Sequence, residues 1–292
     1  MPNVSTKDLW AATAKGGSAD PHAGQPQQAA SQGEPHPADD AYVVPVSTVR
    51  LPSKGLTYPH ESPLYLAEAV DIKAVTAKEE NILASPVLIR NGKVLTTLMK
   101  ACITNRLIDP DEMLLGDKNA VLIAIRVSAY GPKYDARVTC PECSEEGDYE
   151  FDISKLKLKT LDVEPVNGPG TNEFKFTLPV SKRDAFFKLM DVTTSARLNQ
   201  DMDAVRKKTG QDQGVTLRLQ SQVTRIAGVQ PGKPLVQAIE NLPAQDSRAL
   251  RSYMDDIAPD VDMSQEFECT ACGKKSEVEI PLGTGFFWPS RA

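Results

Sequence analysis

The chain has 292 residues, of which 40% are hydrophobic and 25% are charged, and its formal net charge at pH 7 is −6. This length provides enough apolar surface for one large domain or two smaller ones. No apolar run reaches the roughly 18 residues that a membrane-spanning helix needs, and the first residues lack the apolar core of a signal peptide. The acidic balance argues against broad electrostatic binding to nucleic acid or to an anionic membrane.

Residues 1–45 are rich in Ala, Gly, Gln, Pro, Asp and Ser, and apolar periodicity is missing apart from Leu9 and Trp10. Such a segment cannot bury enough apolar surface to offset its ordering entropy, so we expect a flexible arm. Trp10 is either a short anchor for a partner or an exposed residue of the arm. His22 and His36 lack a paired ligand spacing, and we expect them to be solvated.

Residues 46–131 are expected to combine short strands with helices. Pro52 and Gly55 predict an extended segment with a turn, and the partial alternation over 65–76 predicts strand. Thr76 and Glu79 have the spacing of a capping box at the start of a helix, and apolar spacing predicts a second helix over about 92–107. Cys102 lies on the apolar face of that second helix, so we expect a core thiol.

A further helix start is predicted by Asp109-Pro110-Asp111-Glu112, which combines a cap, a proline at the first position and first-turn acids. We then expect a helix with Asp117 as its cap that ends near Gly131. Its apolar run at 121–125 is also compatible with a buried strand, but the cap and the length favour a helix.

Two Cys-x-x-Cys motifs, Cys140/Cys143 and Cys269/Cys272, lie between segments that alternate like strands. Four thiolates are the complete tetrahedral set for a structural Zn²⁺, and no ligand position is left for a catalytic water. The alternatives are two pairs of reduced thiols or disulfides. A redox motif of the thioredoxin type would need a helix after the cysteines, whereas strand-like sequence follows both pairs.

The region between the two motifs changes character near residue 180. Residues 156–159 and 174–176 alternate and predict a small antiparallel meander. Helices are then expected to begin at positions with capping residues or apolar spacing, namely at Ser181, Thr194, Thr216, Leu235 and Asp246. The basic residues of this region are expected to form a solvated face, because no aromatic residues are interleaved to stack bases.

The predicted fold class is therefore α+β. A flexible arm (1–45) precedes a core (46–179 and 259–292) that combines a helical block, a small antiparallel sheet and a split zinc ribbon. A helical subdomain (180–258) is inserted into this core. Near the end of the chain, Phe286, Phe287 and Trp288 either pack against the ribbon or dock on a partner. With Trp10, they are the candidate partner-binding residues.

No catalytic site is expected. The chain has no His-Glu-x-x-His motif, Walker loop, dinucleotide-binding glycine pattern or Gly-x-Ser-x-Gly motif. Of its three histidines, two lie in the expected arm and the third, His60, follows a proline. The sequence therefore favours a protein that is not an enzyme.

Several short motifs, taken in their order along the chain, resemble those of a known family. These are Leu-Pro-Ser-Lys-Gly at 51–55, the helical block 76–130, the two Cys-x-x-Cys motifs, and Phe-Phe-Trp-Pro at 286–289. Over residues 46–292 the chain resembles the baseplate hub and hub-assembly proteins of contractile-tailed bacteriophages. The resemblance implies no catalytic residues, and the four cysteines carry over as a metal-stabilised platform.

The resemblance also implies what the protein does. It predicts a protein that builds or chaperones the central baseplate and whose partners are other baseplate or tail proteins. Within the baseplate, an oligomer of this chain is one possible form. Its location would be the host cytoplasm during assembly or the virion tail baseplate. The alternative is a zinc-ribbon protein that binds nucleic acid or acts in transcription. It would need a basic face, but only Lys274 and Lys275 oppose the five glutamates near the cysteines.

Overall fold

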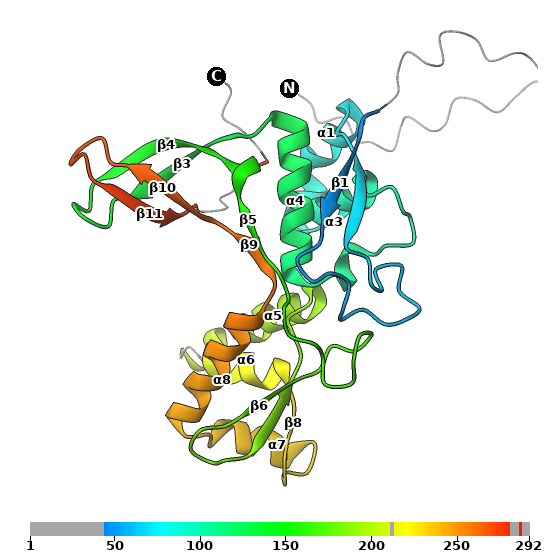
Figure 1. Cartoon of the computed structure of the whole chain (residues 1–292), viewed down its shortest axis with the longest axis vertical. Helices are drawn as coiled ribbons and strands as arrows, with labels where there is room; N and C mark the ends of the chain where they lie inside the picture. The colour runs from blue at the N-terminus through cyan, green and yellow to red at the C-terminus, as the bar shows by residue number, and fades with distance from the viewer. Residues whose placement is uncertain (1–43, 211–212, 281–285, 288–292) are drawn as a thin grey trace, which may run out of the picture. The chain divides into compact units, whose positions relative to one another are not determined.

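The computed structural model describes residues 44–210, 213–280 and 286–287 (Figure 1). Most of the predicted arm, with Trp10, lies outside these residues, and so does Trp288. The described residues form small antiparallel sheets and helices, which confirms the α+β class. No helix among them is long and apolar enough to cross a membrane.

The first part of the fold packs a two-stranded sheet on helices. Strand β1 (Val46–Arg50) pairs with β2 (Ala69–Lys73), and helices α1 (Ala77–Leu83), α2 (Pro86–Arg90) and α3 (Val94–Cys102) follow. The capping box predicted at Thr76 and Glu79 is present. Cys102 is buried, as expected.

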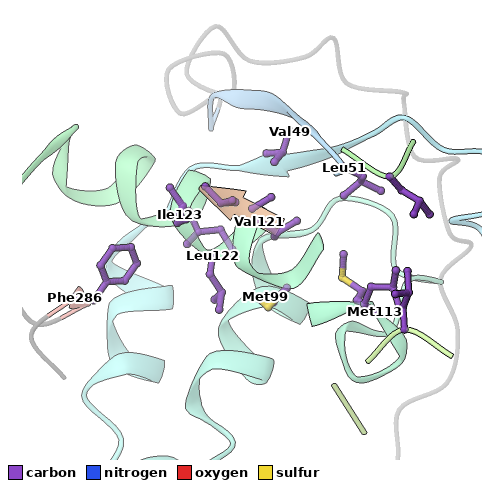
Figure 2. Packing of buried hydrophobic residues seen from close by; sticks show 14 of the residues in the cluster. Val49, Leu51, Met99, Met113, Val121, Leu122, Ile123 and Phe286 are labelled. Atoms are coloured by element: carbon purple, nitrogen blue, oxygen red, sulfur yellow. The ribbon is translucent and has the colours of Figure 1, made fainter. Parts of the chain in front are cut away.

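Helix α4 (Leu115–Tyr130) carries much of this core and follows a short 3-10 helix, η2 (Pro110–Glu112). Figure 2 shows Val49 of β1 above Val121 of α4, with Ile123 and Leu51 toward opposite sides of this pair. The predicted helix over this region is confirmed, and the alternative of a buried strand at 121–125 is wrong.

The predicted capping role of Asp117 is wrong. Helix α4 begins two residues earlier, with Leu114 as the capping position. The fully buried carboxylate of Asp117 accepts hydrogen bonds from the Ser53 backbone N–H (2.9 Å), the Ser53 hydroxyl (2.5 Å) and the Tyr58 hydroxyl (2.6 Å). Burial raises the pKa of Asp117. The carboxylate therefore ties the loop after β1 to the first turn of α4.

Two hairpins follow, far apart in the sequence. Strand β3 (Lys133–Thr139) pairs with β4 (Glu146–Asp152), and β10 (Ser264–Glu268) pairs with β11 (Lys275–Glu279). After the short helix η3 (Ile153–Lys155), strand β5 (Lys157–Lys159) pairs with β9 (Asp260–Asp262). The predicted meander is wrong, because β5 does not pair with the strand that follows it.

The region predicted to be helical (180–258) contains two strands of a three-stranded sheet. Strand β6 (Phe174–Thr177) pairs with β7 (Asp184–Phe187), and β7 pairs with β8 (Val223–Ile226). The helix expected from Ser181 is thus wrong, and the helix expected from Thr216 ends before β8. The proposed domain boundary at residue 180 separates β6 from its partner β7.

Four helices accompany this sheet: α5 (Val192–Thr209), α6 (Gly214–Gln222), α7 (Lys233–Glu240) and α8 (Ala244–Ile257). Asp191, not Thr194, caps α5, because its carboxylate accepts a hydrogen bond from the Thr194 N–H. Asp246 does not cap α8. It lies in the first turn and accepts hydrogen bonds from the backbone N–H groups of Val180 and Ser181.

Candidate metal centre

The two Cys-x-x-Cys motifs form turns with matching backbone hydrogen bonds. In the first turn, the Ser144 N–H donates to the Cys140 carbonyl oxygen at 2.8 Å. In the second, the Gly273 N–H donates to the Cys269 carbonyl oxygen, also at 2.8 Å. Ser144 and Gly273 both adopt positive φ, 62° and 69°. Each hairpin thus ends in the same kind of turn, which points two sulfurs in one direction.

All four sulfurs meet at one place. Cys140 Sγ lies 3.9 Å from Cys272 Sγ, and Cys143 Sγ lies 3.7 Å from Cys269 Sγ. All four sulfur atoms lie within 4.8 Å of one another. A tetrahedral Zn²⁺ with bonds of about 2.3 Å separates its sulfurs by about 3.8 Å, so the cluster fits this ion. The predicted assembly of the two distant motifs is confirmed, and none of the four cysteines is in a disulfide.

The four sulfurs cannot all ionise so close together without a compensating charge. The Cys272 backbone N–H, with that of Ala271 and the Tyr149 hydroxyl, lowers the pKa of Cys269 to about 6. Although the Glu145 backbone N–H favours the thiolate of Cys143, desolvation and the neighbouring sulfurs raise the pKa of Cys143 to about 12. Like charges at this separation disfavour one another. Four thiolates therefore need a positive ion among them, and a bound divalent cation supplies that charge.

Other contacts across the cluster join the two hairpins. The Tyr149 hydroxyl of β4 lies 3.2 Å from the Thr270 hydroxyl and accepts a hydrogen bond from the Thr270 N–H at 3.1 Å. Its ring packs edge-on against Phe267 of β10, with centroids 4.9 Å apart. Lys274 Nζ forms an ion pair with Glu142 Oε2 at 2.6 Å.

These partners of the cluster were not predicted from the sequence. Tyr149 could be identified only as an alternating strand residue, and its contact with Thr270 spans 121 residues. The opposite charges of Glu142 and Lys274, at corresponding turns, were the only indication that these two residues lie together.

The surface around the cysteines is acidic. Five glutamates near the two turns have exposed side chains: Glu142, Glu145, Glu146, Glu266 and Glu268. Lys274 is paired with Glu142, and Lys275 lies 4.0 Å from Glu268. The basic residues of the ribbon are therefore neutralised by neighbouring acids, which disfavours phosphate binding.

Two of the candidate partner-binding residues are buried within the chain. Phe286 and Phe287 are only 5% and 3% exposed. The Phe286 ring packs edge-on against Tyr134 of β3, and its carbonyl oxygen accepts a hydrogen bond from Arg126 Nε at 2.7 Å. Of the two alternatives for this motif, packing within the chain or docking on a partner, the structure shows packing within the chain for Phe286 and Phe287. Trp288 and Trp10 lie outside the described residues.

Comparison with known proteins identifies the family. A family model described as "T4 bacteriophage base plate protein" matches residues 46–288, which include all four clustered cysteines. Searches of curated proteins and of solved structures found no match. The match covers most of the chain and agrees with the phage-baseplate resemblance of its motifs. The chain therefore belongs to the T4 bacteriophage base plate protein family.

Proposed function

We propose that this baseplate protein is a non-enzymatic component of the baseplate hub, acting as a structural part or as an assembly chaperone. We further propose that a structural Zn²⁺ bound by Cys140, Cys143, Cys269 and Cys272 gives it a rigid docking body. The observation that carries the proposal is the convergence of four sulfurs within 4.8 Å from two separate hairpins. The four protein ligands leave no open position for a reacting water, which supports a structural role.

The geometry also supports a mechanical reason for the metal. The two hairpins belong to separate two-stranded sheets, so no β-pairing connects them within the described residues. A small ribbon of this kind has little core of its own, and a metal site supplies the missing stability. With the ion bound, the two hairpins would present one surface of fixed shape to the other proteins of the baseplate.

The charge of that surface supports protein partners over nucleic acid. Exposed glutamates surround the turns, and the ribbon lysines already have acidic partners. A nucleic-acid site would require unpaired basic residues facing the phosphates. We therefore place this chain among proteins that act through contacts with other baseplate or tail proteins.

Two measurements test the proposal. Metal analysis of the purified full-length protein should find about one zinc per chain, and a protein purified without any bound metal would refute the structural Zn²⁺. Mass spectrometry of purified virions and of tail assembly intermediates tests the role. A structural hub protein would be found in both samples and a departing chaperone only in the intermediates. Absence from both would refute a hub function.

A further inference from the structure

A groove separate from the metal centre runs along one face of α4. We call it the α4 groove, and its volume is about 390 Å³. One wall is β1, the floor is α4, and the opposite wall is formed by η3, β5 and β9. The described residues show no strand or helix seated in it.

The β1 wall presents the edge of a strand. Four consecutive residues of β1, 47–50, line the groove, as expected for a strand seen from its edge, since a face would expose alternate residues. Within the described part of the chain, β1 pairs only with β2, so its second edge has no strand partner. β1 contains no proline, a residue that would block further pairing. Such an edge can accept an additional strand.

The floor and the far wall are apolar. Ala120, Ile123, Ala124 and Val127 of α4 follow the i, i+3, i+4, i+7 spacing and form one helical face toward the groove. On the far wall, Leu158 of β5 is paired directly with Val261 of β9, so both side chains lie on the same face of the two-stranded β5–β9 sheet. Leu158 remains 37% exposed. Ala120, Ile123 and Val261 are already buried, whereas Ala124, Val127 and Leu158 keep exposed surface that an apolar occupant would cover.

One charged residue lines the groove. Arg50, at the end of β1, is exposed, and its guanidinium forms no hydrogen bond or ion pair with the residues that the structure describes. A single guanidinium in an otherwise uncharged groove favours one carboxylate in its occupant. It is too little positive charge for a nucleic-acid backbone.

We propose that the α4 groove binds an extended segment of another baseplate protein, which adds to β1 as a third strand. Alternate apolar side chains of this segment pack on α4 and Leu158, and an acidic residue pairs with Arg50. The choice of a baseplate protein as the partner rests on the proposed function, whereas the mode of binding rests on the groove itself.

Photo-cross-linking in phage-producing cells tests the site. A benzophenone amino acid is placed in the full chain at Ser47 in the groove or, as a control, at Val87 on α2, which is 56% exposed and does not line the groove. Position 47 should cross-link to one segment of a baseplate protein, and position 87 should not cross-link to that segment. Ala124→Trp, which fills the groove, should remove the cross-link. Arg50→Glu, which reverses the charge of an exposed side chain, should also remove it.

The outcomes separate the two proposals. If the chain copurifies with baseplate proteins but position 47 cross-links only within this chain, to a second copy of it, or to nothing, the groove proposal is wrong. The proposed function then still stands. If the chain copurifies with no baseplate protein, the proposed function fails first.

A synthetic peptide with the sequence of the cross-linked segment tests strand addition. Its affinity for the full-length protein is compared with that of two N-methylated peptides. Methylating the amides that face β1 should weaken binding about tenfold or more, because the hydrogen bonds to β1 are lost. Methylating the alternate amides should have little effect. Equal effects of both peptides, or no binding of the unmodified peptide, would overturn the proposal.

Discussion

Removing one cysteine ligand should release the two hairpins from each other without unfolding the rest of the protein. Cys143→Ser suits this test because Cys143 is exposed and its substitution disturbs no core packing. The hydroxyl of serine does not replace a thiolate as a zinc ligand under ordinary conditions, because it stays protonated. We expect the variant to lose its bound metal.

The structure sets the size of the effect. Without the ion, the hairpins retain the two Tyr149–Thr270 hydrogen bonds, the hydrogen bond from Gln265 Nε2 to the Asp152 carbonyl oxygen, the Tyr149–Phe267 ring contact and one exposed ion pair. The hydrogen bonds and the ring contact together contribute about 2–6 kcal/mol, and an exposed ion pair adds little. A structural Zn²⁺ contributes about 10–16 kcal/mol in zinc-finger peptides. A bound Zn²⁺ would therefore dominate the attachment of one hairpin to the other.

Hydrogen exchange with mass spectrometry measures this effect locally. The N–H groups of Cys140, Ser144, Cys269 and Gly273 are hydrogen-bonded within the two turns. In Cys143→Ser their protection factors should fall to about 10², the level that the remaining contacts support. Protection in α4 should change little.

Cys102 offers a matched control in the same chain. It is a fully buried cysteine outside the cluster, and burial raises its pKa to about 11. Cys102→Ala should lower the free energy of unfolding by about 1 kcal/mol while keeping one metal per chain. Our reasoning would be refuted if Cys143→Ser kept both its metal and the protection of residues 269–273.

Three further substitutions have expected outcomes. Asp117→Leu leaves a buried N–H and two hydroxyls without an acceptor and should cost about 3 kcal/mol or more in urea unfolding; an unchanged midpoint would contradict this. Although burial opposes it, hydrogen bonds from Lys73 and Thr76 lower the pKa of Glu79 from 4.5 to about 2. The ionised Glu79 carboxylate stabilises the fold above pH 4.5, and this contribution is lost as the pH falls toward 2. The difference in free energy of unfolding between wild type and Glu79→Gln should therefore shrink by about 3 kcal/mol over that range; a constant difference would refute it. Gly273→Ala should cost about 1 kcal/mol because φ is positive there, and a stability equal to wild type in urea would argue against that backbone strain.

The sequence predicted local features better than distant ones. The Cys-x-x-Cys turns could be predicted because thiolate chemistry and spacing lie within a few residues, and the capping box at Thr76 is equally local. Asp117 could not be assigned correctly, because its partner Ser53 is 64 residues away. A carboxylate near a helix start looks like a cap unless the distant hydrogen-bond donors are known.

The wrong helix at Ser181 has a similar cause. Ala185, Phe186 and Leu189 are spaced as on one helix face, but short apolar runs fit helix and strand alike. In the structure, β7 lies between β6 and β8, and three of its four residues are buried. Pairing with one strand on each side decides the conformation of β7, and neither partner strand can be inferred from the sequence of β7 alone.

The separation of the two cysteine turns has a consequence during protein synthesis. Cys143 and Cys269 are 126 residues apart, and ribosomes add about 5–20 residues per second. The first pair of thiols therefore waits about 6–25 s for the second to be translated. During this interval the nascent chain exposes an incomplete chelate, which competing metals or oxidants can reach. A Zn²⁺ at this site could therefore gain its complete set of four ligands only after the second turn has been made.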